Sequence, residues 1–159
     1  MKKYVILTPA IGGMGGSQMF CNNKAKYLKQ NGWEVYLIYF QNFEILISDL
    51  KQFSSFWVPK LSYGIQYVLP YQRDCILACV SDYIGSFDEC VIESHMVKLA
   101  MWGELIAERL SCIHILNPIE EELHPLSEGY TKFMEYKLKR NELLNSSEAA
   151  LKRFFRTQY

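Results

Sequence analysis

The sequence has no surplus of either charge and no long apolar run. Its 17 Lys and Arg residues balance 17 Asp and Glu residues, so the formal net charge is zero. A general nucleic-acid-binding protein would carry a basic excess, and none is present. No stretch is long and apolar enough for an obvious membrane span. The apolar run at 4–7 is too short for a secretory signal, and we expect a β-strand there instead.

Metal-binding cysteine patterns are also missing. The five cysteines contain no Cys-x-x-Cys pair. Cys75 and Cys79 are one helical turn apart, but the nearest histidine, His95, lies far along the chain. We expect no metal site. The cysteines are interpreted as free thiols in a reducing compartment, acting as small apolar residues.

The composition is that of an ordinary globular domain, with 159 residues of which 50% are hydrophobic and 21% charged. A strand–helix–strand unit opens the chain. Residues 4–8 form a short apolar run, helical periodicity extends over 18–30, and Asn31-Gly32 is a typical helix stop. Residues 33–40 (WEVYLIYF) then predict a second strand. Such units build parallel sheets.

A second unit of the same kind is predicted by a strand at 88–92, a helix over 96–110 and a strand at 112–116. Between the two units, the patterns indicate a short strand at 44–47, a loop-like aromatic stretch and a helix over 72–84. We therefore expect residues 1–159 to form one α/β domain: a Rossmann-like, doubly wound parallel sheet flanked by helices, with a helical C-terminal segment.

The C-terminal segment carries helical patterns over 130–144 and 147–155. Lys137 and Arg140 project within the apolar arc of the first of these helices. A cation on an apolar face needs a partner. The sequence leaves three partners open: the glutamates at 120–122, an anionic acceptor, or a second domain.

A glycine-rich loop links the first predicted strand to the first helix. Ligands of open α/β sheets bind at the carboxyl ends of the strands, glycines let the backbone approach a ligand, and helix N-termini favour anions. The loop therefore predicts a phosphate or diphosphate site, and the alternative is a tight turn without a ligand. The candidate binding residues are Gly12, Gly13, Gly15, Gly16 and Ser17.

Two well-known phosphate loops do not fit this segment. The dinucleotide pattern G-x-G-x-x-G needs a third glycine where Gln18 stands, and the second strand ends in Gln41-Asn42 without an acid for a ribose. The P-loop needs a lysine that Gly16-Ser17-Gln18 lacks. We therefore expect no NAD(P) and no other cofactor.

A second candidate motif, Glu93-Ser94-His95, ends the strand of the second unit at the same sheet edge. Histidine both donates and accepts hydrogen bonds near neutral pH, and Glu93 is placed to bind a hydroxyl or orient His95. The alternative is local capping, in which Ser94 caps the next helix and His95 only lies on its first turn. His114, in the middle of a predicted strand, is interpreted as a core histidine.

Residues 2–40, with the motif IGGMGGSQMFCNNKAKYLKQNGWEVYLI, resemble the start of retaining glycosyltransferases of family four, which have the GT-B architecture. Residues 91–110 (VIESHMVKLAMWGELIAERL) resemble that family's strand-end histidine and helix more weakly. The resemblance implies transfer of a hexose from a nucleotide-sugar donor to a glycan or lipid-linked acceptor, in polysaccharide biosynthesis and without a metal. It implies that His95 is a catalytic residue touching the transferred sugar, and that Glu93 and the glycine loop bind substrate.

The resemblance also implies that the chain is the N-terminal, acceptor-side half of a two-domain enzyme. No second doubly wound domain with the family's E-x7-E signature fits after residue 118, so we expect the chain to be inactive alone. A cytoplasmic location follows from the resemblance, with peripheral contact at the inner membrane face as an extension. The alternatives are a stand-alone nucleotide or sugar-phosphate binding module without catalysis, and a non-catalytic interaction domain.

Overall fold

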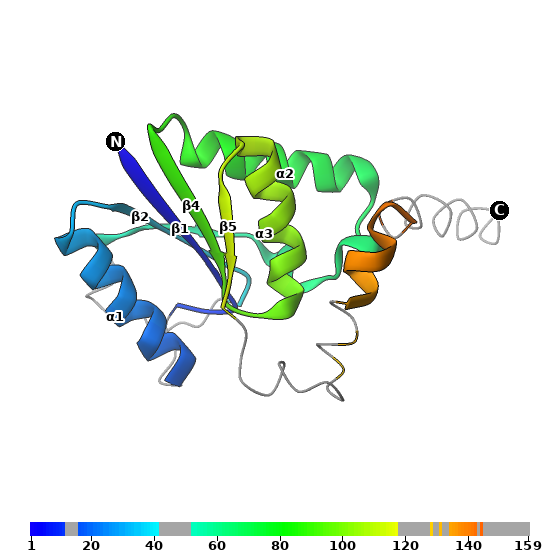
Figure 1. The fold of residues 1–159 in the computed structure, drawn as a ribbon, viewed down its shortest axis with the longest axis horizontal. Coiled ribbons are helices and arrows are strands. Elements are labelled where there is room, and N and C mark those ends of the chain that lie inside the picture. The colour runs from blue at the N-terminus through cyan, green and yellow to red at the C-terminus, as the bar shows by residue number, and fades with distance from the viewer. Residues whose placement is uncertain are drawn as a thin grey trace.

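The computed structural model describes residues 1–11, 16–41, 52–117, 128, 131, 134–142 and 144. A five-stranded, all-parallel sheet forms its centre (Figure 1). The sheet has the order β3-β2-β1-β4-β5, which is the order of doubly wound folds and confirms the predicted class. The strands are β1 (Lys2–Thr8), β2 (Glu34–Tyr39), β3 (Ser54–Trp57), β4 (Glu89–Ser94) and β5 (Ile113–Leu116).

Helices cover both faces of the sheet. Helix α1 packs on one face, and helices α2 and α3 pack on the other (Figure 1). Two short 3₁₀ turns, η2 and η3, lead from β3 into α2. The bounds are α1 (Gly16–Gln30), η2 (Pro59–Ser62), η3 (Ile65–Tyr67), α2 (Pro70–Ile84) and α3 (Val97–Leu110).

The alternation along β1 divides the hydrophobic core into two layers. Tyr4 and Ile6 pack on the α1 side, whereas Val5 and Leu7 pack on the side of α2 and α3. All four side chains are buried, as expected for the central strand of a parallel sheet covered on both faces. The central position of β1 places its carboxyl end beside that of β4.

The predicted helix stop is confirmed at the end of α1. Gly32 has a φ of +86°, a left-handed conformation that glycine adopts without strain. Gly85 ends α2 in the same way, with a φ of +70°. The predicted helix at 72–84 begins two residues earlier, because Pro70 occupies the first helical position, where its missing N–H costs nothing.

The third strand is the main difference from the sequence prediction. The predicted strand at 44–47 lies outside the described residues. Strand β3 lies at Ser54–Trp57, a segment for which the sequence predicts no strand. Among the described strands it lies at the edge of the sheet and pairs with β2 alone, and it is mostly exposed, so its residues lack the apolar pattern of a buried strand.

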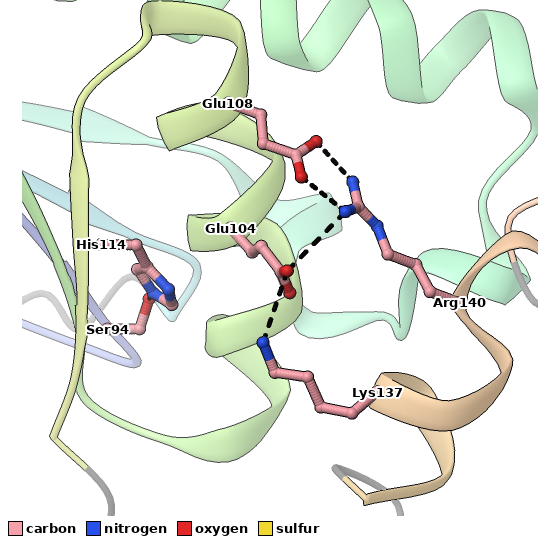
Figure 2. A network of polar contacts seen from close by, with 6 residues as sticks. All are labelled: Ser94, Glu104, Glu108, His114, Lys137 and Arg140. Atoms are coloured by element: carbon pink, nitrogen blue, oxygen red, sulfur yellow. Dashed lines mark hydrogen bonds and ion pairs between the residues drawn. The ribbon is translucent and has the colours of Figure 1, made fainter.

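The C-terminal helical segment, 134–142, packs against α3. Its Tyr136 is fully buried in the core shared with α3. Arg140 forms a bidentate ion pair with Glu108, and Lys137 lies 3.4 Å from Glu104 (Figure 2). Both cations thus pair with glutamates of α3, and the three partners left open by the sequence stay untested. The glutamates at 120–122 lie outside the described residues.

Candidate functional site

The carboxyl ends of β1 and β4 form the topological switch point of the sheet. The chain leaves β1 toward β2 on one side, and leaves β4 toward β5 on the other. Ligands of doubly wound folds bind in the crevice created by this divergence. The two ends are tied together by a hydrogen bond of 3.0 Å from the His95 N–H to the carbonyl of Leu7. The predicted Glu93-Ser94-His95 motif therefore lies at the switch point.

Glu93 is the most deeply buried charged side chain at this crevice, with 1% of its surface exposed. Lys24, from α1, pairs with it at 2.5 Å between Nζ and Oε1. Asn117, which follows β5, places its Nδ2 3.5 Å from the same oxygen. Lys24 and Asn117 thus converge on one carboxylate oxygen, and the other oxygen, Oε2, has no hydrogen-bond partner among the described residues.

The carboxyl group of Glu93 is ionised over the whole physiological range. Burial raises the pKa of a carboxyl group, because it removes water from the charged form. In Glu93 this effect is outweighed by the neighbouring His95 and by the hydrogen bond and charge of Lys24, so that its pKa falls to about 2. Glu93 therefore acts as a hydrogen-bond acceptor and not as a proton donor.

His95 lies directly beside the free oxygen of Glu93. Its Nε2 is 3.5 Å from Oε2, which is longer than a normal hydrogen bond. Among the described residues neither atom has a hydrogen-bond partner, although His95 is only 6% exposed. The ring of Phe20, on α1, lies 6.0 Å away between centroids. Two buried polar atoms without partners suit a ligand group that both donates and accepts, such as a hydroxyl.

Helix α1 packs its buried Cys21 and Ala25 against the sheet and also carries the polar Lys24 and Asn22. Lys24 also lies over the ring of Tyr4, 5.4 Å from its centroid, which fixes the ammonium group near β1. Burial raises the pKa of the Cys21 thiol to about 12, so this cysteine stays protonated. Asn22 is buried with an unpartnered Oδ1.

Ser94 contacts α3 and β5 and does not cap α3. Its Oγ lies 3.1 Å from the Leu99 carbonyl and 2.9 Å from Nε2 of His114, so the predicted capping role is wrong. If the hydroxyl donates to Leu99, it accepts from an Nε2–H of His114. Burial lowers the pKa of His114, which keeps the ring neutral. Figure 2 shows this contact beside Glu104, and His114 is the satisfied histidine predicted from the sequence.

The glycine loop is only partly within the described residues. Gly12, Gly13 and Gly15 lie outside them, while Gly16 and Ser17 are the first two residues of α1. The first turn of α1 contains no acidic residue, so no carboxylate of its own neutralises the positive end of the helix dipole. The binding roles of these five residues stay predictions.

Lys24 and Asn117 were not predicted as site residues. Lys24 had a detectable signal, because it falls on the same helical face as Cys21 and Leu28, and a lysine on an apolar face requires a partner. Asn117 had no such signal, since an Asn-Pro pair after a strand is typical of a turn.

Within the described ranges, no group of three or more His, Cys, Asp or Glu side chains is arranged to hold a metal ion. The helices described there also include none with the length and apolar character that a membrane crossing requires. Comparison with protein-family models, with curated proteins and with solved structures finds no match to this chain.

Proposed function

We propose that this chain is the N-terminal, acceptor-side domain of a retaining GT-B glycosyltransferase that transfers a hexose from a nucleotide sugar to a glycan or lipid-linked acceptor. One observation carries the proposal. Glu93 and His95 present two buried, unpartnered polar atoms 3.5 Å apart at the switch point of a doubly wound sheet. Such a pair is costly to bury unless a ligand completes its hydrogen bonds.

In this proposal the crevice is divided between the two parts of the donor. The diphosphate lies at the N-terminus of α1, where backbone N–H groups and the helix dipole favour an anion. A sugar hydroxyl bridges Glu93 and His95, donating to the carboxylate and accepting from the imidazole. Lys24 keeps Glu93 ionised and fixed, and His95 is the residue that touches the transferred sugar.

The proposal includes a second domain that closes over the crevice and grips the nucleotide. Catalysis in such a cleft needs both walls, because closure excludes water and completes the binding site. The 159-residue chain by itself is therefore expected to bind donors weakly and to show no robust turnover. We place the enzyme in the cytoplasm, with contact at the inner face of the membrane where the acceptor is lipid-linked.

A panel of nucleotide sugars tests the proposal by thermal shift, with NAD and NADP included. We expect a UDP-, GDP- or ADP-sugar to raise the melting temperature of the parent chain. His95→Ala and Glu93→Gln should lose the ligand-induced rise, whereas Asn23→Ala, an exposed change on α1, should keep it. The rise is taken relative to each variant's own ligand-free melting temperature, so that a change in intrinsic stability does not enter.

Two outcomes would contradict the proposal. A rise with NAD or NADP and none with nucleotide sugars would indicate an oxidoreductase. A rise that His95→Ala and Glu93→Gln both retain would place the donor elsewhere. A different experiment distinguishes this proposal from the alternative of a stand-alone binding module. That experiment is an assay of sugar transfer by a protein that carries the second domain, where the alternative predicts no transfer.

A further inference from the structure

A cavity lies at the start of α3, the helix that follows the Glu93-Ser94-His95 motif in the chain. It has a volume of about 330 Å³, which is within the range of small-molecule pockets. One wall is the start of α3, beginning with Met96, the residue that follows His95 in the chain. The other wall is the segment 62–67, from the end of η2 through η3. Along the chain, the lining of the cavity therefore begins one residue after His95.

Two tyrosines on this cavity are unusually exposed for aromatic side chains. Tyr63 is 55% exposed and Tyr67 is 78% exposed. Their backbone is nevertheless fixed: the Tyr63 carbonyl accepts a 2.9 Å hydrogen bond from Nε1 of buried Trp102, and the Tyr67 N–H donates to the Gly64 carbonyl at 2.9 Å. Buried aliphatic side chains alternate with the tyrosines and anchor the segment: Leu61, Ile65 and Val68. Rings held on a fixed backbone bind at low cost in conformational entropy.

The cavity wall also contains an unsatisfied hydrogen-bond acceptor. Gln66 lines the cavity, and its buried Oε1 has no hydrogen-bond partner in the part of the chain that the structure describes. The amide folds back over Gly64, where an added Cβ would lie 2.7 Å from that oxygen. Gly64 thus makes room for the amide in its observed position. A buried acceptor without a donor calls for a ligand O–H or N–H group.

The remaining lining defines the chemistry of the ligand. Met96 and Met101 are apolar, and Lys98 and Glu128 bring one charge of each sign. A fatty chain would leave the Gln66 amide unpaired, and an anionic group would meet Glu128 as well as Lys98. A hexopyranose satisfies both kinds of wall, since it has an apolar C–H face to lie on an aromatic ring or methionine and hydroxyls to pair with the polar groups.

We propose that this cavity binds the neutral hexose end of a glycan. Its role as the acceptor site, one residue from His95, rests on the proposed function. Carbohydrate binding itself does not rest on the proposed function, because we infer it from the tyrosines, the methionines and the unpaired Gln66 oxygen. Of the two acceptor classes that the sequence leaves open, the cavity therefore favours the glycan over a lipid-phosphate group.

The test is an NMR titration of the ¹⁵N-labelled chain with methyl glycosides of glucose, galactose, mannose and N-acetylglucosamine, alongside phenol. We expect at least one glycoside to bind with a millimolar dissociation constant and to shift the signals of 62–67 and of the start of α3. Gln66→Leu and Tyr67→Ala should each weaken binding about tenfold, as for one lost hydrogen bond or stacking contact. Tyr27→Ala removes an equally exposed tyrosine from α1 and should leave binding unchanged.

Gly64→Ala is a second, milder variant, because it displaces the Gln66 amide without removing it. We expect this variant to bind the glycoside more weakly while its NMR spectrum keeps the dispersion of a folded protein. Absence of binding by all four glycosides, or binding of phenol alone in this cavity, overturns the inference. Glycoside binding without any response to nucleotide sugars supports the inference and contradicts the proposed function. Nucleotide-sugar binding without glycoside binding supports the proposed function and overturns the inference about the cavity. The failure of the inference and the failure of the proposed function are therefore distinguishable.

Discussion

The hydroxyl oxygen of Ser94 and Nε2 of His114 lie 2.9 Å apart, and together they fill the space above Gly103 of α3. A Cβ at position 103 would lie 2.6 Å from Nε2 and closer still to the Ser94 oxygen. We expect Gly103→Ala to lower the free energy of unfolding by about 1–3 kcal/mol, as overpacking of a core does. Urea denaturation of the parent and the variant measures the loss.

Gly64→Ala is the matched control for this prediction. Its added methyl group meets only the end of the flexible Gln66 side chain, which can turn aside. Its unfolding free energy should therefore stay close to the parent value. Equal losses in the two variants would show that the Ser94–His114 contact does not restrict position 103.

The pH dependence of stability should contain a contribution from Glu93. Its pKa is about 2 in the folded chain and near the ordinary 4.5 in the unfolded chain. Because the unfolded state takes up the proton first, this contribution is complete above about pH 5 and is lost as the pH falls toward 2. It is on the order of 3 kcal/mol for a shift of this size.

Glu93→Gln should reduce the dependence of the unfolding free energy on pH in the acid range. Urea unfolding at intervals of about half a pH unit between pH 3 and pH 7 measures this dependence. The slope is compared, because the variant also leaves Lys24 unpaired and loses stability at every pH. The control is Glu89→Gln, which makes the same chemical change at a half-exposed position of the same strand. An unchanged slope in Glu93→Gln would mean that the carboxyl titrates alike in both states.

Four of the five thiols should react in two classes with a neutral alkylating reagent. Cys75 and Cys79 are exposed on α2, so both should be modified in the native chain. Cys21 and Cys90 are buried and should react only after unfolding. Mass spectrometry of peptides after short native labelling assigns the sites. Native labelling of Cys21 at the rate of Cys75 would contradict the packing of α1 on the sheet.

Arg140 should hold the C-terminal segment on α3. Arg140→Gln removes ion pairs to Glu104 and Glu108 that are partly exposed, so we expect a modest loss of about 0.5–1.5 kcal/mol. Faster hydrogen exchange of amides in 134–142 is the more sensitive readout. Lys139→Gln makes the same charge change at an exposed position of the same helix and should leave the exchange unchanged.

The fold could be predicted where burial leaves an apolar run or a helical periodicity in the sequence. Strands β1 and β2 and the helices α1 and α3 all show it, and their bounds differ from the predicted ones by only a few residues. Strand β3 does not, since an edge strand with exposed side chains has the composition of a loop. The pairing order of the strands is also not local information, although two strand–helix–strand units restrict it strongly.

The candidate site could be predicted as a place more readily than as a set of contacts. The end of β4 pointed to Glu93 and His95 because parallel strands end at a common edge. The Lys24 contact depends on how α1 crosses that edge, and the Asn117 contact depends on where β5 ends. Tyr63 and Tyr67 drew no prediction, since an aromatic residue in an irregular segment has no periodicity from which its exposure can be inferred.

The position of β1 in the middle of the sheet has a consequence for how the chain folds. Lys3 pairs on one side with Glu34 and on the other with Cys90. At translation rates of about 5–20 residues per second, one flank of β1 is therefore without its neighbour for roughly 5–20 s after the strand is made. Pairing parallel strands that are far apart in the sequence costs loop-closure entropy before favourable contacts form. Folding should therefore be slow for a domain of this size. An apolar strand that waits this long for its second neighbour is the segment on which a ribosome-associated chaperone would act.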